Sequence, residues 1–164
     1  MSMDKENKHF LSMLANNKGI IYKVANSYCK NVEDRNDLIQ EITINLWKSW
    51  SKYNDKFKVS TWMYKIALNV AISFYRKTYQ RDSFNLENYK EFIFIDEGED
   101  IELSDNIKQL YYYIAKLDEL NKALILLYLD QYSYEDIAST LGISKTNVAT
   151  KISRIKNQLK KNFQ

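Results

Sequence analysis

The sequence predicts an all-α protein made of two small helical domains joined by an acidic linker. The 164 residues contain no proline and only three glycines, the two residue types that most disfavour helix interiors. Apolar residues recur every three or four positions over most of the chain, which is the pattern of amphipathic helices. Hydrophobic residues make up 45% of the sequence, enough to build buried cores, and the length suits one domain or two small ones.

Charge divides the chain into three blocks, although the formal net charge is only +3. Residues 56–81 hold six basic residues and no acid. Residues 82–109 hold nine acids and two basic residues, and residues 143–164 again hold six basic residues and no acid. Two basic blocks separated by an acidic one indicate two nucleic-acid contacts with an unlike segment between them.

The first domain is expected to span residues 9–77 as a unit of three or four helices. Residues 1–8 are polar and expected to be loose, because chain ends fray unless something ties them down. The predicted helices cover about 9–30, with a possible break at Gly19, about 33–50, and from a cap at Ser60 or Thr61 to about 77. Their apolar faces comprise Phe10, Leu14, Ile21, Val24, Ala25 and Tyr28; Leu38, Ile39, Ile42, Leu46, Trp47 and Trp50; and Trp62, Ile66, Ala67, Val70, Ala71 and Phe74.

The middle of the chain is predicted to be a linker over residues 78–106, because it is acidic and has no clear helical period. The apolar run Phe92–Ile95 within it could form a strand or dock elsewhere, but a strand there has no obvious partner. The second domain, residues 107–164, begins with helical periodicity over 107–128. This stretch is expected to form two helices that break near residues 118–121.

A helix-turn-helix is predicted over residues 133–160. Ser133 with Asp136 can form a capping box, Gly142 can take the left-handed conformation of a tight turn, and Ser144 can cap the second helix. The second helix would enter the DNA major groove by its N-terminal end while the first crosses the backbone. A plain helical hairpin with a solvated basic face is the competing interpretation. The absence of any acid after the turn argues against it.

Aromatic and basic side chains are interleaved in the loop before the third predicted helix, at Tyr53, Phe57 and Lys58. Aromatic rings stack on unpaired bases and lysines follow phosphates, so this loop suits single-stranded nucleic acid. A purely structural role for the loop is an equally good interpretation. For Trp62 and Phe74, which lie on a helical pattern, we expect a place in the core instead.

Catalysis is not expected from this composition. Cys29 is the only cysteine and lies on an apolar helical pattern, so we expect a core thiol and neither a disulfide nor a thiolate metal cluster. His9 is the only histidine, and no phosphate loop or metal-ligand spacing is present. We therefore expect no enzyme, metal or cofactor. No apolar run suits a signal peptide or a membrane span, so a cytoplasmic protein without membrane insertion is expected.

Two parts of the chain resemble region 2 and region 4 of bacterial sigma factors. The sequences Asp37-Leu-Ile-Gln-Glu41, Leu46-Trp47 and Ser60–Asn69 are similar to region 2. The sequences Tyr134-Glu-Asp-Ile-Ala138 and Leu141-Gly-Ile-Ser144 are similar to region 4. A chain with only these two domains and a short linker resembles the extracytoplasmic-function (ECF) sigma factors.

The resemblance implies a protein that binds core RNA polymerase, directs it to promoter DNA and helps to open the duplex. It also leaves room for an anti-sigma factor as a partner. The residues it assigns to docking on the clamp helices of the polymerase's largest subunit are Asp37, Gln40, Glu41, Asn45 and Trp47. Those assigned to the −10 promoter region are Phe57, Lys58, Lys65, Asn69 and Arg76. Those assigned to the −35 element are Lys145, Thr146, Asn147, Thr150, Lys151 and Arg154.

Two other classes of protein compete with this interpretation. An ordinary helix-turn-helix regulator would bind a duplex operator as a dimer, but it has no need of the block from residue 37 to residue 69. A helical scaffold or an anti-sigma-like interaction protein would make no DNA contact. The two acid-free basic blocks argue against that second alternative.

We expect limited proteolysis of the full chain to cut first between residues 78 and 106, because an acidic segment without helical periodicity offers the least protected backbone. Mass spectrometry of the early fragments checks this. A first cut inside residues 9–77 or 107–164 would contradict the predicted domain organisation.

Overall fold

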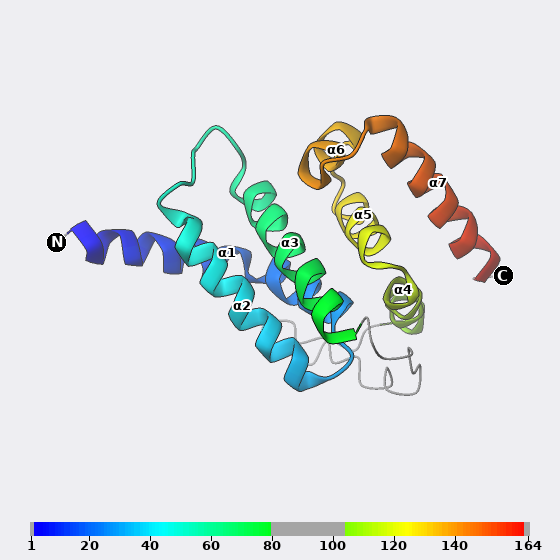
Figure 1. Ribbon diagram of the computed structural model, residues 1–164, viewed down its shortest axis with the longest axis horizontal. Coiled ribbons are helices and arrows are strands. Elements are labelled where there is room, and N and C mark those ends of the chain that lie inside the picture. The colour runs from blue at the N-terminus through cyan, green and yellow to red at the C-terminus, as the bar shows by residue number, and fades with distance from the viewer. Residues whose placement is uncertain (1, 80–103, 163–164) are drawn as a thin grey trace.

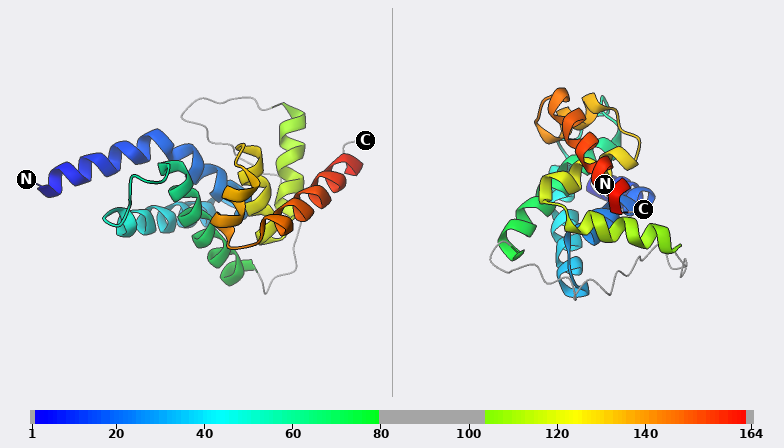
Figure 2. Two further views of the ribbon diagram at one scale, coloured as in Figure 1. Left: turned by 90° about the horizontal axis from the view of Figure 1, so that it is seen from above. Right: turned by 90° about the vertical axis from the view of Figure 1, so that its right-hand side faces the viewer.

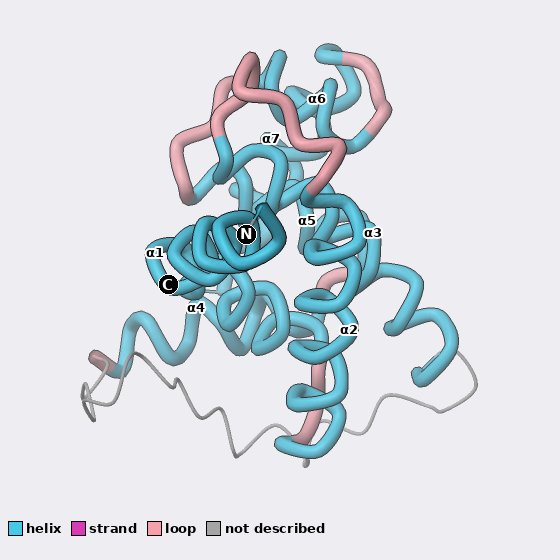
Figure 3. Tube along the Cα trace, turned by 90° about the vertical axis from the view of Figure 1, so that its left-hand side faces the viewer, coloured by secondary structure: helices cyan, strands magenta, loops and turns pink. Residues whose placement is uncertain are grey.

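The described residues of the computed structural model, 2–79 and 104–162, form helices and loops with no strand (Figures 1 and 3). The helices are α1 (Ser2–Tyr28), α2 (Val32–Trp50), α3 (Val59–Tyr79), α4 (Asp105–Lys116), α5 (Glu119–Leu129), α6 (Tyr134–Leu141) and α7 (Lys145–Asn162). The all-α prediction is confirmed. Most of the predicted linker, including Phe92–Ile95, lies outside the described residues.

Helix α1 is longer than the sequence predicted. The expectation of a loose segment over residues 1–8 is wrong, because the helix begins at Ser2, and it runs without a break past Gly19. Its N-terminal end projects beyond the other helices (Figures 1 and 2). Burial of Phe10 against α2 anchors this end, with the ring centroids of Phe10 and Trp47 4.9 Å apart. A single glycine costs a helix only about 1 kcal/mol, which a continuous packed helix tolerates.

Helices α1, α2 and α3 pack against one another around a common core. Asn31 caps α2, its side chain accepting a hydrogen bond from the Asp34 backbone N–H at 2.8 Å. Helix α3 begins at Val59, which puts Lys58 in the cap position, so the predicted cap at Ser60 or Thr61 is wrong by two or three positions. Its fully buried residues are Met63, Tyr64, Ala67, Leu68 and Ala71, whereas Trp62, Ile66, Val70 and Phe74 are only half-buried. The residues that α3 buries most deeply therefore lie on a different side of the helix from the one predicted. The reason is that α3 packs on α5 and α6 as well as on α1 and α2.

The second half is organised around α5. The predicted break falls between α4 and α5, where Asp118 caps α5 by accepting a hydrogen bond from the Asn121 backbone N–H at 2.9 Å. Residues 122–127 are all buried, as expected for a helix with neighbours on every side. Helices α4, α6 and α7 pack on α5, which therefore carries the helix-turn-helix.

The two halves share one hydrophobic core, which includes residues of α1, α2 and α3 together with residues of α5, α6 and α7. Helix α5 contacts both α1 and α3, and the Tyr28 hydroxyl donates a hydrogen bond to the Glu119 carbonyl oxygen. Figure 2 shows α5 and α6 lying against the first three helices. Independent folding of residues 9–77 and 107–164 as domains stays a prediction.

Lys122 is the one fully buried lysine among the described residues, and it lies where the halves meet. Its Nζ atom lies 4.5 Å from the ring centroid of Tyr75 on α3 and 5.2 Å from that of Tyr28 on α1. Nζ has no hydrogen-bond partner. Burial lowers the pKa of Lys122 to about 8, with Cys29, Glu119 and the other nearby charges contributing less.

We expect Lys122→Met to stabilise the protein by about 1–3 kcal/mol at pH 7, because a long apolar side chain avoids burying an ammonium without a hydrogen bond. The folded chain holds fewer protons than the unfolded chain between pH 8 and the ordinary lysine pKa of 10.5. The stability of the unmodified protein should therefore rise with pH across that window, and the variant should lose this rise. Thermal unfolding followed by circular dichroism from pH 7 to 10 measures both effects.

Lys108→Met on α4 is the matched control, because Lys108 is exposed. It should leave both the melting temperature and its pH dependence nearly unchanged. A lower melting temperature for Lys122→Met at pH 7 would show that the buried ammonium stabilises the structure.

Candidate nucleic-acid interface

The helix-turn-helix forms as predicted from its capping residues. The Ser133 hydroxyl oxygen accepts a hydrogen bond from the Asp136 backbone N–H, and that of Ser144 accepts one from the Asn147 backbone N–H, both at 3.1 Å. Gly142 ends α6 with φ +69°, a conformation that glycine adopts without strain. The turn closes with a hydrogen bond from the Ile143 N–H to the Ala138 carbonyl oxygen at 3.1 Å.

Helix α7 buries one face and exposes another. Val148, Ile152 and Ile155 are buried against the rest of the protein. Of the six residues predicted to read the −35 element, Lys151 is half-buried. The other five are exposed: Lys145, Thr146, Asn147, Thr150 and Arg154. The structure brings these six residues together on the first three turns of α7. No acidic residue occurs on this helix, so its outer face is electropositive.

A cleft of about 290 Å³ lies between the loop that precedes α3 and the helix-turn-helix. Two of the predicted −10 residues, Phe57 and Lys65, line it. The other lining residues are Lys52, Tyr53, Asn54, Thr61, Trp62, Ser139 and Thr140. Tyr53 packs between Trp50, which it stacks on at 5.5 Å between ring centroids, and Trp62 at 5.0 Å. The cleft therefore combines fixed aromatic rings with two lysines.

Trp62 packs against the core, as predicted, but it also lines the cleft. Lys52 and Asn54 were not among the predicted site residues. The signal that could have found them was their place in the same loop as Tyr53 and Phe57, which the sequence already marked as aromatic and basic.

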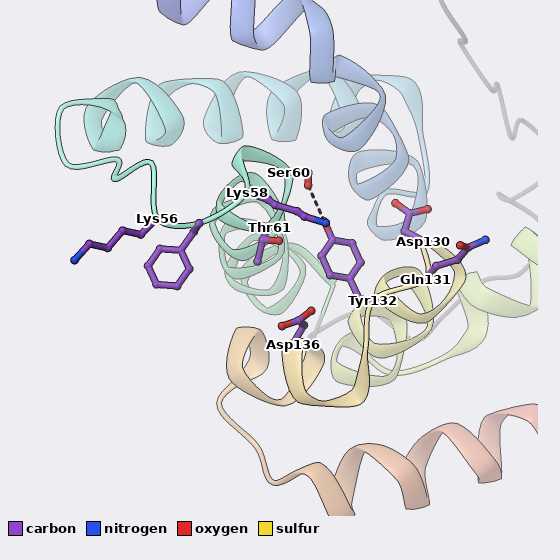
Figure 4. Close-up of a pocket in the computed structure, with 9 residues that line it drawn as sticks. Lys56, Lys58, Ser60, Thr61, Asp130, Gln131, Tyr132 and Asp136 are labelled. Atoms are coloured by element: carbon purple, nitrogen blue, oxygen red, sulfur yellow. Dashed lines mark hydrogen bonds between the residues drawn. The ribbon is translucent and has the colours of Figure 1, made fainter.

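A second cleft of about 390 Å³ adjoins the same loop, and Figure 4 shows the residues that line it. Lys58 enters from the loop, whereas Asp130 and Asp136 come from the second half of the chain. Phe57 also lines this cleft. Three of the five predicted −10 residues, Phe57, Lys58 and Lys65, thus line two neighbouring hollows at the start of α3.

The remaining two predicted −10 residues lie farther along α3. Asn69 is exposed one turn beyond Lys65. Arg76 lies about 16 Å from Lys65 along the helix axis, at 1.5 Å per residue, so the structure does not gather it with the others. The Nε atom of Arg76 is 3.1 Å from a carboxylate oxygen of Glu119 on α5. The pKa of Glu119 is lowered by a hydrogen bond from its own backbone N–H and, to a smaller extent, by Arg76.

The five predicted polymerase-binding residues are exposed on α2: Asp37, Gln40, Glu41, Asn45 and Trp47. Trp47 is 46% exposed although one edge packs on Phe10. Ile44, which the sequence prediction missed, is 50% exposed between them. The sequence did contain a signal for Ile44. It is an apolar residue on the polar side of an amphipathic helix, three and four positions after Glu41 and Gln40.

The described residues contain no group of three or more histidine, cysteine, aspartate or glutamate side chains that could hold a metal ion. No helix among them has the length and apolar character of a membrane span. Cys29 is buried, as predicted, and burial raises the pKa of its thiol well above the ordinary value.

A helix-turn-helix with a basic outer face, joined to a helical unit with an aromatic and basic cleft, is typical of a DNA-binding protein. Comparisons with known proteins agree with this class. Residues 13–81 match the family model of Sigma-70 region 2, and residues 107–159 match that of Sigma-70, region 4. The chain belongs to the ECF sigma factors of bacterial RNA polymerase.

Relatives of similar length support the assignment. The chain is 30% identical to the RNA polymerase sigma factor YlaC of Bacillus subtilis, over 81% of this chain and 79% of the relative. It is 29% identical to the ECF RNA polymerase sigma factor SigW of the same organism, over 90% of this chain and 84% of the relative. In fold it is similar to the sigma factor RpoE of Bartonella quintana, which was solved in complex with the anti-sigma factor NepR. The TM-score is 0.72 at 20% sequence identity, and the match covers 94% of this chain and 96% of the RpoE chain.

We expect Lys151→Ala and Lys145→Ala to have different effects on DNA binding. Lys145 is at the N-terminus of α7, where helices favour phosphate, so its loss should weaken binding to all sequences alike and lower the salt dependence. Lys151 lies two turns in, where a side chain can reach base edges, and its loss should change discrimination between −35 variants by about 1–3 kcal/mol.

The measurement is binding of the full chain, assembled with core polymerase, to a series of −35 variants at two salt concentrations. Lys160→Ala, near the far end of α7, is the matched control and should preserve the order of preference among the variants. Equal losses across all variants for Lys151→Ala would identify Lys151 as a phosphate contact.

Proposed function

We propose that three surfaces of this sigma factor divide the work of promoter recognition. The exposed side of α2 binds core polymerase, the cleft at the start of α3 holds an unpaired base of the −10 region, and the outer face of α7 reads the −35 element. The observation that carries the proposal is that most of the residues suggested by the family resemblance are exposed on α2, on α7 and around the start of α3, in a fold that matches both sigma regions. The protein acts in the cytoplasm with polymerase and catalyses no reaction itself.

The polymerase-binding role of α2 is supported by its mixed character. Asp37, Gln40 and Glu41 offer charge and hydrogen-bonding groups, while the adjacent Ile44 and Trp47 expose apolar surface. Aromatic residues with a polar surround are typical of the anchors of protein–protein interfaces. The main core contacts of α2 come from Leu38, Ile42 and Leu46 on the opposite face, and of the docking residues only Trp47 also packs on the core, with one edge on Phe10.

The −10 role of the α3 cleft is supported by its chemistry. A base removed from the DNA stack loses stacking energy, which an aromatic ring can restore by about 1–3 kcal/mol. Phe57 is 65% exposed and available for such contact. Lys52 and Lys65 lie on the same cleft and can bind the flanking phosphates.

An anti-sigma factor is a further partner of this class. The sigma factors RpoE and CnrH, both similar in fold to this chain, were solved with the anti-sigma factor NepR and with the cytosolic domain of CnrY. A dimeric operator-binding regulator is not favoured, since the region 2 match over residues 13–81 has no role in such a protein.

Copurification with core RNA polymerase, followed by transcription from candidate promoters in vitro, tests the proposal. We expect Asp37→Arg with Glu41→Arg to reduce binding to core polymerase by about tenfold or more, because the change reverses two exposed charges on the proposed docking face and disturbs its electrostatic fit to the partner. Circular dichroism should show unchanged helicity, since both side chains are exposed.

The matched control is Asp105→Arg on α4, which is exposed and far in sequence from α2. It should leave polymerase binding unchanged. Full association of the α2 double variant with core polymerase would count against the docking role of α2.

A further inference from the structure

The loop between α2 and α3, residues 51–58, consists of two turns joined by a tyrosine hydroxyl. In the first turn, the Tyr53 backbone N–H donates a hydrogen bond to the Trp50 carbonyl oxygen at 3.1 Å. In the second turn, the Phe57 backbone N–H donates to the Asn54 carbonyl oxygen at 3.3 Å. The Tyr53 hydroxyl donates to the Phe57 carbonyl oxygen at 2.8 Å and so ties the start of the loop to its end. Figure 1 shows this loop projecting between α2 and α3.

Two tryptophans hold the Tyr53 ring in place. The ring is stacked on Trp50, with 5.5 Å between ring centroids and 10° between the ring planes. The Trp62 ring lies 5.0 Å from it at 48°. Both tryptophans pack against the hydrophobic core of the protein. Tyr53 is half-buried, whereas the other residues of the loop are exposed. The Tyr53 hydroxyl is therefore fastened to the packed helices, and it acts on a part of the loop that is otherwise open to solvent.

Tyr53 and Phe57 line the same cleft but differ in what they offer to a base. A base can stack on an aromatic ring only where a face of that ring is open. One face of Tyr53 is stacked on Trp50, and Trp62 lies close to the ring as well. Phe57 is 65% exposed. Phe57 is therefore the ring available for stacking, and Tyr53 is bonded to the backbone carbonyl of that same residue.

We propose that Tyr53 is a positioning residue of the −10 contact. Its hydroxyl fixes the backbone at Phe57, so that the loop presents Phe57 and the neighbouring Lys58 to an unpaired base and its phosphate before DNA binds. This role rests on the proposed function of the cleft, whereas the hold of Tyr53 on the loop does not. A loop that is ordered in advance loses less conformational freedom on binding, which raises affinity without a new contact.

Asn54 supports the same loop shape from within. Its side-chain Oδ1 atom accepts a hydrogen bond from the Lys56 backbone N–H at 3.0 Å, two residues further on. Such an Asx-turn fixes a few residues only. The Tyr53 hydroxyl reaches across this turn to the Phe57 carbonyl oxygen and connects it to the tryptophans. Asn54→Ala should therefore weaken base binding in the same direction as loss of the Tyr53 hydroxyl.

Hydrogen exchange of the free full chain, followed by NMR, tests the hold on the loop. Tyr53→Phe keeps the aromatic ring but removes the hydroxyl. The backbone amides of Lys56 and Phe57 should then exchange about three- to tenfold faster, as expected for the loss of one hydrogen bond. Tyr22→Phe makes the same change at a half-buried tyrosine of α1, and this matched control should leave both rates unchanged. Unchanged exchange in Tyr53→Phe would overturn the proposal.

A double-mutant cycle with the holoenzyme tests the positioning role. The probe is a fluorescein-labelled single strand with the −10 sequence of a promoter identified by transcription in vitro, and binding is followed by anisotropy. Tyr53→Phe should weaken binding about three- to tenfold, and Phe57→Ala should weaken it by at least as much. The two changes together should cost no more than Phe57→Ala alone, because Tyr53 acts through Phe57. Affinity for core polymerase should stay the same in Tyr53→Phe.

The outcomes separate the role of Tyr53 from the function of the cleft. Equal losses from Tyr53→Phe with and without the Phe57 ring would show that Tyr53 acts on DNA by itself, and would overturn the positioning role. Normal binding by Tyr53→Phe, when Phe57→Ala binds weakly, would overturn it too and leave the −10 assignment in place. If neither variant loses affinity while exchange in the loop rises as expected, the −10 assignment fails and the hold of Tyr53 on the loop stands.

Discussion

Burial of α5 on every side is the constraint on which the rest of the structure depends. Leu124, Leu126 and Leu127 belong to the main core that extends through α1, α2 and α3, and Ile125 belongs to a smaller cluster with Ile114 and Ile155. Each fully buried side chain of this kind contributes about 1.5–3 kcal/mol. The same short helix thus fixes the position of the helix-turn-helix and fastens it to the first three helices.

Helix α5 therefore serves two packing roles, because it carries the helix-turn-helix and also contacts α1 and α3. Just after it, Asp130 and Tyr132 join the two halves of the chain through hydrogen bonds with Tyr64 and Ser60 of α3. Here those residues lie at the start of α3, beside the aromatic and basic loop. The surface of α7 is free of such contacts over Lys145 to Asn147, where the side chains are exposed. The predicted −10 surface at the start of α3 therefore borders the second half of the chain, whereas the start of α7 is exposed.

Local sequence signals located the helix-turn-helix well, because each one acts within a few residues. Ser133 and Ser144 accept hydrogen bonds from backbone groups three positions away, and Gly142 supplies a left-handed conformation by itself. Such interactions do not depend on distant parts of the chain. The same holds for the exposed polar side of α2, whose residues follow from helical spacing once the helix is known.

The sequence by itself determined the all-α class, the order of the helices, the caps and turn of the helix-turn-helix, and the exposed faces of α2 and α7. Only the tertiary structure decided the core face of α3, where Tyr64 is buried because a second set of helices packs on it. It also decided that the N-terminal half of α1 packs on α2, where the Phe10 ring lies against Trp47. The roles of Lys122 and Asp130 were beyond the sequence, because each depends on contacts with residues more than 40 positions away.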